Sequence, residues 1–156
     1  MSDYITREGM NILRQRMEYL VRQRSEIIKQ VASAREMGDL SENAEYHAAR
    51  EQQRVVEKEY NHLRKRVMKL KVIDAENIPK DAVRFGARVT IREVSQGRIR
   101  KIRLVGIDEV FHTDDQFERM SIASPIGEAM IGRKKGDHFQ VRVPIGKREF
   151  EILDIE

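Results

Sequence analysis

Four acidic residues crowd one short segment of the chain: Glu36, Asp39, Glu42 and Glu45. Asp39 and Glu42 are three residues apart, and Glu42 and Glu45 are one helical turn apart, so their carboxylates can share one face. Carboxylates this close are the hard oxygen ligands that Mg²⁺ or Mn²⁺ prefers. Acidic residues are also favoured at a helix N-terminus, where each stabilises the helix dipole by about 0.3–1 kcal/mol. The pattern alone therefore leaves metal binding and helix capping both open.

The acidic segment lies between two stretches that have a helical hydrophobic pattern. In residues 8–37, apolar side chains recur at steps of three and four, as in a coiled coil. They are Leu13, Met17, Leu20, Ile27, Val31 and Ala34, with Arg24 in the one skipped position. Thr6 is predicted to cap this helix, and Gly38 is predicted to end it with a positive φ.

The second helical pattern runs from about Glu42 to Lys71, and Ser41 before it is typical of a helix start. Its seam consists of Ala49, Val56, Leu63, Val67 and Leu70, with Gln52 and Tyr60 in the remaining positions. The spacing slips near Tyr60, where we expect a local irregularity. Only three or four residues separate the two helices, which predicts antiparallel neighbours.

A helical hairpin of this kind constrains what its acidic tip can do. About 30 residues per helix give a length of roughly 45 Å. We expect the narrow tip to have no pocket that excludes water or holds a substrate. Mg²⁺ held by two carboxylates keeps several waters and needs further ligands. If the tip does metal chemistry, a partner must therefore supply the rest of the site.

The second half of the chain has the pattern of a strand-rich domain. Residues 76–86 carry Pro79 and Gly86 and are typical of a linker. Five segments then show alternation or β-branched enrichment: residues 87–94, 98–107, 119–124, 138–143 and 148–155. Residues 125–132 are predicted to form one short helix. The expected fold class is α+β, with an N-terminal antiparallel coiled-coil hairpin (1–75) and a globular domain (80–156).

Composition excludes several kinds of protein. The 156 residues are 36% charged and 6% aromatic, which favours an elongated part with little interior. With no cysteine, disulfides and thiolate chemistry are excluded. No apolar run approaches the roughly 20 residues of a membrane span, and we expect a cytoplasmic protein without a signal segment. The net charge of +4 is compatible with a polyanionic partner.

Basic residues flank the acidic segment. Arg35 precedes it, and Arg50 and Arg54 follow it one and two turns later. They can contact phosphates, or they can pair with nearby glutamates on the helix surface. The four histidines have no metal-ligand spacing, and no phosphate-binding glycine loop is present.

The segment "GDLSENAEYHAAREQQ" (38–53) resembles the signature of the Gre transcript cleavage factors. The stretches "TREGMNILRQRMEYL" (6–20), "FGARVTI" (85–91) and "SPIGEAMIGRKKGD" (124–137) also resemble that family, so the likeness covers nearly the whole chain. The resemblance implies that the globular domain is similar to FKBP-type domains. It further implies a bacterial transcription factor whose hairpin enters the secondary channel of backtracked RNA polymerase. The polymerase then cleaves its own nascent RNA and frees the 3′ end.

The resemblance also assigns roles to residues. Asp39 and Glu42, supported by Glu45, would hold a Mg²⁺ ion shared with the polymerase. Arg35, Arg50 and Arg54 would contact the nascent RNA, and the pair Ser124 and Pro125 would contact the polymerase. The factor would not be an enzyme on its own, and we expect it to act as a monomer.

Three alternatives stay open beside this hypothesis. A Gre-like protein can occupy the channel and inhibit the polymerase, although the unaltered "GDLSENAEY" argues against that. A coiled-coil adaptor would use its acidic residues only for capping. A free-standing metal nuclease is disfavoured, because a bare tip has no pocket.

Overall fold

The computed structural model describes residues 3–38, 43–112 and 116–156. The predicted metal ligands Asp39 and Glu42 lie outside the described residues. The chain divides into two compact units. One is Met10–Lys69, and the other combines Met1–Gly9 with Leu70–Glu156. The two are described here as the helical unit and the globular unit.

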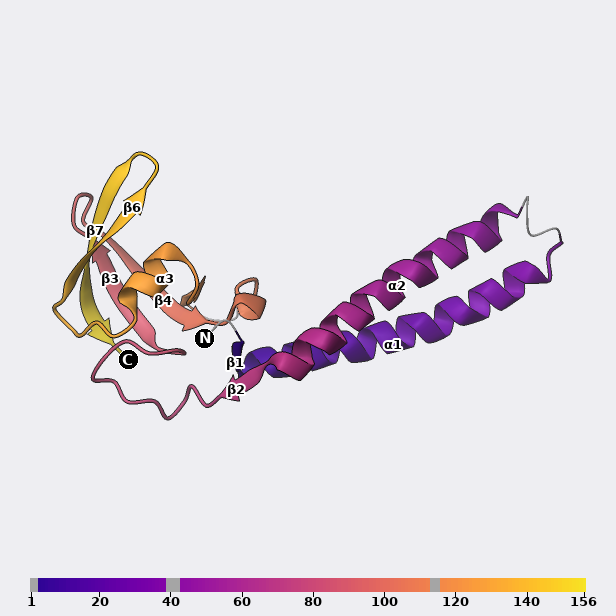
Figure 1. The fold of residues 1–156 in the computed structure, drawn as a ribbon, viewed down its shortest axis with the longest axis horizontal. Helices are drawn as coiled ribbons and strands as arrows, with labels where there is room; N and C mark the ends of the chain where they lie inside the picture. Colours follow the sequence, from indigo (N-terminus) through magenta and orange to yellow (C-terminus); the bar gives the residue numbers. More distant parts are fainter. Residues whose placement is uncertain (1–2, 39–42, 113–115) are drawn as a thin grey trace. The chain divides into compact units, whose positions relative to one another are not determined.

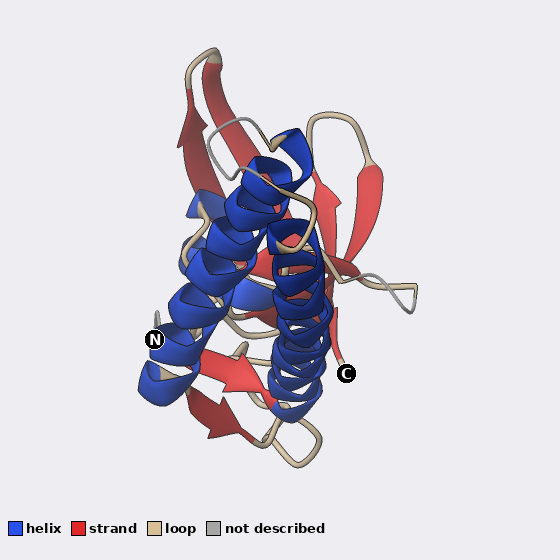
Figure 2. Cartoon of the chain, turned by 90° about the vertical axis from the view of Figure 1, so that its right-hand side faces the viewer, coloured by secondary structure: helices blue, strands red, loops and turns tan. Residues whose placement is uncertain are grey.

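The helices α1 (Arg7–Arg35) and α2 (Ala44–Lys69) form an antiparallel hairpin and lie side by side in Figures 1 and 2. The helical unit is this hairpin without Arg7–Gly9, which belong to the globular unit. Near the tip, Ile27 and Val31 are buried against Ala49. Toward the other end, the Arg16 guanidinium lies 2.8 Å from the Glu59 carboxylate. Because residue numbers rise along α1 as their partners fall along α2, the predicted antiparallel pairing is confirmed.

Most of the predicted seam faces inward. Leu20, Ile27, Val31 and Ala34 of α1 are buried, and Ala49 is the buried residue of α2. Gln52 was predicted to lie in the seam, and this is wrong: it is exposed, while its neighbour Gln53 is half-buried. The irregularity expected near Tyr60 is also wrong at the level of the backbone, since α2 is a continuous helix from Ala44 to Lys69.

The helix ends are set by local hydrogen bonds. The Thr6 hydroxyl accepts a hydrogen bond from the Gly9 backbone N–H at 3.0 Å, which confirms the predicted cap of α1. Gly38 has φ 130°, a positive value as expected from its place after the helix. Helix α2 begins at Ala44 rather than near Glu42, and Asn43 caps it.

The globular unit contains the five predicted strands and the predicted short helix. The strands are β3 (Arg88–Glu93), β4 (Arg98–Val105), β5 (Glu118–Ser121), β6 (His138–Val143) and β7 (Gly146–Ile155), and the helix is α3 (Pro125–Met130). The strands form one sheet in the order β5-β4-β3-β7-β6, with β4 and β5 parallel and the other neighbours antiparallel. Figure 1 labels β3, β4, β6 and β7 of this sheet. A 3₁₀ turn, η1 (Ile107–Glu109), follows β4. The α+β class with a helical hairpin and a strand-rich domain is confirmed.

One face of the sheet packs into the core of the globular unit. Ile91, Ile102, Leu104, Phe150 and Ile152 are fully buried there, and Met130 brings α3 onto the same core. At about 25 cal/mol per Å² of apolar surface, such burial is the main stabilising contribution to this unit.

Two short strands were not predicted. β1 (Tyr4–Thr6) and β2 (Lys71–Ile73) pair in parallel as a separate two-stranded sheet. β2 begins at Lys71, the residue at which the sequence pattern ended the second helix. Tyr4 contacts Phe85 edge to face, with ring centroids 5.7 Å apart.

Candidate functional site

The described residues beside the acidic segment form a small hydrogen-bonded frame. Asn43 accepts a hydrogen bond from the Tyr46 N–H at 3.0 Å through its side-chain oxygen. Its side-chain amide donates to the Ala34 carbonyl at 2.6 Å. Glu45 lies in the first turn of α2 and is exposed, where its charge favours the positive end of the helix dipole.

A groove opens beside this frame, between the end of α1 and the start of α2. Its volume is about 370 Å³. It is lined by Gln30, Ser33, Ala34, Met37, Glu45, Ala48, Ala49 and Gln52. The groove is open to solvent, so it does not contradict the expectation that the tip lacks a pocket that excludes water. The small side chains of Ala34, Ala48 and Ala49 leave this space where larger apolar residues would fill the seam.

The three arginines predicted to contact RNA are all described, and all have partners on the helix surface. The guanidinium of Arg35 lies over the Tyr46 ring, 5.7 Å from its centroid. Arg50 donates to the Gln53 side-chain oxygen at 2.8 Å. Arg54 lies 3.0 Å from the Glu51 carboxylate, with both side chains largely exposed. Exposed pairs of this kind contribute only about 0–1 kcal/mol, so an incoming phosphate can displace them.

No group of three or more histidine, aspartate or glutamate side chains is placed to hold a metal ion in residues 3–38, 43–112 and 116–156. Of the predicted acidic site residues, Glu45, to which we gave a supporting role beside the metal ligands Asp39 and Glu42, is the one that the structure describes. In the same described ranges, no helix is both long and apolar enough to cross a membrane.

Ser124 and Pro125, the predicted polymerase contacts, form the start of α3. The Ser124 hydroxyl donates to the Ser121 carbonyl at 2.7 Å and accepts from the Gly127 N–H at 3.1 Å. Gly127 has no room for a Cβ, which would collide with the Ser121 carbonyl oxygen. The hydroxyl of Ser124 is thus occupied in building the turn, whereas the ring of Pro125 is exposed.

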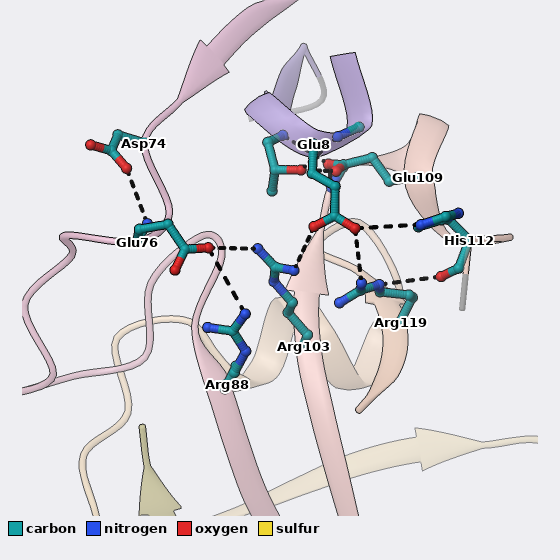
Figure 3. Close-up of polar contacts among 11 residues, drawn as sticks. Glu8, Asp74, Glu76, Arg88, Arg103, Glu109, His112 and Arg119 are labelled. Carbon is teal, nitrogen blue, oxygen red and sulfur yellow. Dashed lines mark hydrogen bonds and ion pairs between the residues drawn. The ribbon is translucent and has the colours of Figure 1, made fainter. Parts of the chain in front are cut away.

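An ionic cluster around two buried arginines in the globular unit was not predicted from the sequence (Figure 3). Glu8, in the first turn of α1, lies 3.2 Å from a guanidinium nitrogen of Arg103 and 3.5 Å from one of Arg119. The side chains of both arginines are only 3% exposed. The His112 imidazole lies 3.4 Å from the same carboxylate. Strands β4 and β5 therefore hold the first turn of α1 through charge.

The cluster continues to the segment after β2. Glu76 lies 3.7 Å from Arg103 and 3.9 Å from Arg88, as Figure 3 shows. The Asp74 carboxylate accepts hydrogen bonds from the Glu76 N–H at 3.1 Å and the Asn77 side chain at 3.2 Å. These hydrogen bonds to the charged form lower the pKa of Asp74. No local pattern could reveal this cluster, because Glu8 and Arg103 are 95 positions apart.

Glu109 makes a second buried contact with the start of α1. Its carboxylate accepts hydrogen bonds from the Thr6 N–H at 3.0 Å and the Gly106 N–H at 2.9 Å. The Thr6 hydroxyl, which caps α1, also donates to this carboxylate. The globular unit thus determines where α1 begins.

A helical hairpin, followed along the chain by a five-stranded α+β unit, defines a protein of two parts, and the described residues near one end of the hairpin include Glu36, Glu45 and Arg50. Two family models match these two parts. The model described as "Transcription elongation factor, N-terminal" matches residues 3–72, and "Transcription elongation factor, GreA/GreB, C-term" matches residues 78–156. The chain therefore belongs to the GreA/GreB family of transcription elongation factors.

Curated relatives agree with the family models. The chain is 36% identical to transcription elongation factor GreA of Maridesulfovibrio salexigens, over 97% of this chain and 92% of that protein. It is 38% identical to GreA of Thermodesulfovibrio yellowstonii, over 97% and 94% of the two chains. A solved structure, GreA factor homolog 1 of Thermus thermophilus, covers 98% of this chain and 97% of its own, with 23% identity and a TM-score of 0.44.

Proposed function

We propose that this elongation factor binds bacterial RNA polymerase and stimulates cleavage of the nascent RNA 3′ end in backtracked complexes. The hairpin domain (1–75) enters the secondary channel, and the globular domain (80–156) docks at the channel mouth. The observation that carries the proposal is membership of the GreA/GreB family, together with the intact segment "GDLSENAEY". The factor acts in the cytoplasm as a monomer and is not an enzyme by itself.

The chemistry of the acidic side chains supports this mechanism. Asp39 and Glu42, with Glu45 in support, offer the carboxylate oxygens that suit Mg²⁺. When bound there, Mg²⁺ shared with the polymerase would supply water activation for phosphodiester hydrolysis. The residues of this chain bring carboxylates to the reaction, while the polymerase brings the remaining ligands and the RNA brings phosphate.

The other predicted residues bind rather than react. Arg35, Arg50 and Arg54 place guanidinium groups beside the acidic segment, where they can bind RNA phosphates in a charge-assisted manner. Pro125 presents an exposed apolar ring for contact with the polymerase. Ser124 keeps that ring in place through the two hydrogen bonds of its hydroxyl.

The decisive experiment measures RNA cleavage in a halted, backtracked elongation complex. The wild-type factor is expected to shorten the RNA from its 3′ end. The Asp39→Asn, Glu42→Gln double variant is expected to bind the polymerase equally well and to give no stimulation. Equal cleavage by the two proteins would refute the proposal, and a wild-type factor that only freezes the complex would indicate an inhibitor instead.

Two controls separate the remaining alternatives. The factor with RNA and Mg²⁺ but no polymerase should give no cleavage, whereas a free-standing nuclease would cleave. An adaptor whose acidic residues only cap a helix would tolerate Asn and Gln at both positions without any change in cleavage.

A further inference from the structure

Three arginines form one row across the sheet of the globular unit. In the strand registers, Arg88 of β3 lies opposite Arg103 of β4, and Arg103 lies beside Arg119 of β5. Paired residues of neighbouring strands point to the same face of a sheet, and neighbouring strands are about 4.8 Å apart. Like charges this close repel one another, so the row needs negative charge between its members.

The two gaps of this row are filled differently. In the gap between Arg103 and Arg119, the Glu8 carboxylate accepts a hydrogen bond of 3.2 Å from Arg103. In the gap between Arg88 and Arg103, one oxygen of Glu76 lies 3.9 Å and 3.7 Å from the two guanidinium groups. Both distances exceed those of charge-assisted hydrogen bonds, which are about 2.7–2.9 Å. Glu76 is therefore a counter-ion that lies too far away to hydrogen-bond to either arginine.

The edge of the Arg103 guanidinium that faces Glu76 has no hydrogen bond among the residues that the structure describes. This edge consists of Nη2, which lies 3.7 Å from Glu76, and of Nε, which is buried without a hydrogen-bond partner. In Arg148, the same edge donates two hydrogen bonds of 2.8 Å to the Glu93 carboxylate. Because the Arg103 side chain is only 3% exposed, leaving this edge without an acceptor destabilises the protein. An acceptor with two suitably spaced oxygens would complete it.

Glu76 can leave the gap without disturbing its own segment. Its side chain is 69% exposed. Its backbone N–H donates to the Asp74 carboxylate at 3.1 Å, which holds the turn after β2 in place. Figure 3 shows the Glu76 carboxylate reaching both arginines from that turn. Movement of one exposed side chain therefore opens the gap to an anion from solvent.

The charge at this gap favours a ligand with more than one negative charge. The Arg88 guanidinium and the Lys101 ammonium group both lie 5.9 Å from the centroid of the Phe117 ring, so a further cation belongs to the same face. The Arg88 side chain is 29% exposed, and partial shielding from water strengthens its attraction for an anion. A dianion would match these cations better than the single charge of Glu76.

We propose that the gap between Arg88 and Arg103 binds a phosphate monoester dianion, which takes the place of the Glu76 carboxylate. Two phosphate oxygens accept from Nε and Nη2 of Arg103, and a third accepts from Arg88. A phosphate monoester carries about −1.5 to −2 charges at pH 7, whereas each phosphodiester of a nucleic-acid backbone carries one. The site therefore selects small phosphorylated molecules over nucleic acid. This binding goes beyond the proposed function and does not depend on it.

The test titrates the wild-type protein with inorganic phosphate at about pH 8, where histidine is neutral, and uses sodium chloride of equal ionic strength as the reference. The NMR signal of the Arg103 Nε–H group is expected to shift and to saturate. Arg88→Gln should raise the phosphate concentration for half-saturation at least about tenfold, because a charge-assisted hydrogen bond is lost. Glu76→Gln should lower that concentration about threefold, because the competing carboxylate is removed.

Two variants provide matched controls in the globular unit. Arg142 of β6 and Glu128 of α3 are exposed. Arg142→Gln and Glu128→Gln repeat the two charge changes away from the gap and should leave the half-saturation concentration unchanged. Circular dichroism checks that every variant is folded. If Arg88→Gln does not fold, Glu76→Gln decides alone, because it removes no cation from the site.

Three results would overturn the proposal. The first is a wild-type Arg103 Nε–H signal that phosphate does not shift more than chloride does. The second is a half-saturation concentration in Glu76→Gln equal to or above that of wild type. The third concerns dimethyl phosphate, a phosphodiester with one negative charge, which should need at least about tenfold higher concentration. Equal binding of dimethyl phosphate and inorganic phosphate would contradict the selection of a dianion.

Discussion

The guanidinium of Arg24 in α1 lies over the ring of Tyr60 in α2, 5.0 Å from the ring centroid. Both side chains are half-buried, so the cation–π contact is partly shielded from water. Contacts of this type contribute about 0.5–1 kcal/mol at exposed sites and more when desolvated. A polar residue in the seam is thus matched by an aromatic one, and the two helices stay regular there.

Replacing Arg24 by Gln should lower the free energy of unfolding by about 1 kcal/mol. Gln keeps the helix propensity of Arg but has no charge to place over the Tyr60 ring. Chemical unfolding followed by circular dichroism measures the change. Arg22→Gln, an exposed position two residues away, is the control and should stay within about 0.5 kcal/mol; equal effects at both positions would contradict the assignment.

The hairpin was predictable because its information is local. Apolar steps of three and four fix a helix face, and a short link fixes antiparallel packing, so Ile27 and Ala49 were each predicted to lie in the seam between the helices. The five strands were predictable for the same reason, since β-branched residues alternate within each. The contact between Arg24 and Tyr60 was not predictable, because each residue taken alone only interrupts the apolar spacing of its own helix.

The ionic cluster and the strands β1 and β2 were beyond sequence reasoning for a different reason. β1 and β2 have three residues each, too few for any periodicity. Arg103 sits between Ile102 and Leu104 in a strand whose alternation predicts a solvated side chain, yet Glu8 covers it. At the candidate site, the acidic and basic residues were identified by type and spacing, whereas the cap at Asn43 was missed because Ser41 was taken as the start signal of the second helix.

Replacing Gly9 by Ala should destabilise the globular unit by about 1–3 kcal/mol, as overpacking does. A Cβ there would overlap the Glu109 carboxylate, which Thr6 and Gly106 hold in place. In a helix without such a neighbour, the same change gains up to about 1 kcal/mol. Urea unfolding of Gly9→Ala is therefore compared with Ser25→Ala on the exposed face of α1. A Gly9→Ala variant as stable as Ser25→Ala would show that Glu109 yields easily.

Replacing Glu8 by Gln should lower the free energy of unfolding by about 1–3 kcal/mol, because Arg103 and Arg119 lose a charged acceptor while staying buried. Glu18→Gln in the same helix is the matched control, since Glu18 is exposed. Denaturant titration measures the free energy of unfolding of both variants, and only that of Glu8→Gln should fall. If Arg103→Met restores stability in the Glu8→Gln background, the loss comes from an uncompensated buried charge.

The pair of Glu93 and Arg148 should make stability depend on pH. Arg148 donates two hydrogen bonds of 2.8 Å to the Glu93 carboxylate, and they lower the pKa of Glu93 below its ordinary 4.5. A depressed folded-state pKa stabilises the protein above the unfolded-state pKa, and this stability is lost as pH falls through the folded value. Glu93→Gln should therefore have a lower melting temperature than wild type at pH 7. The difference between the two melting temperatures should become smaller as the pH falls below about 4.5. Glu118→Gln is the control variant, because Glu118 forms an ion pair with Arg100 in which its own side chain is exposed. We expect a smaller difference in melting temperature from wild type for this variant.

Arg50 should contribute to RNA cleavage through charge rather than through hairpin stability. Arg50 donates a hydrogen bond to the neutral Gln53, so Arg50→Gln costs the fold at most about 0.5 kcal/mol. If Arg50 binds a phosphate of the nascent RNA, the variant should reduce the slope of log affinity against log salt by about one. Cleavage in backtracked complexes is measured over a range of salt concentrations. Arg64→Gln is the matched control, since 14 residues of helix place it roughly 21 Å farther along α2. Equal salt slopes for the two variants would show that Arg50 acts only as a helix-surface residue, because a phosphate contact near the acidic segment must distinguish the two positions.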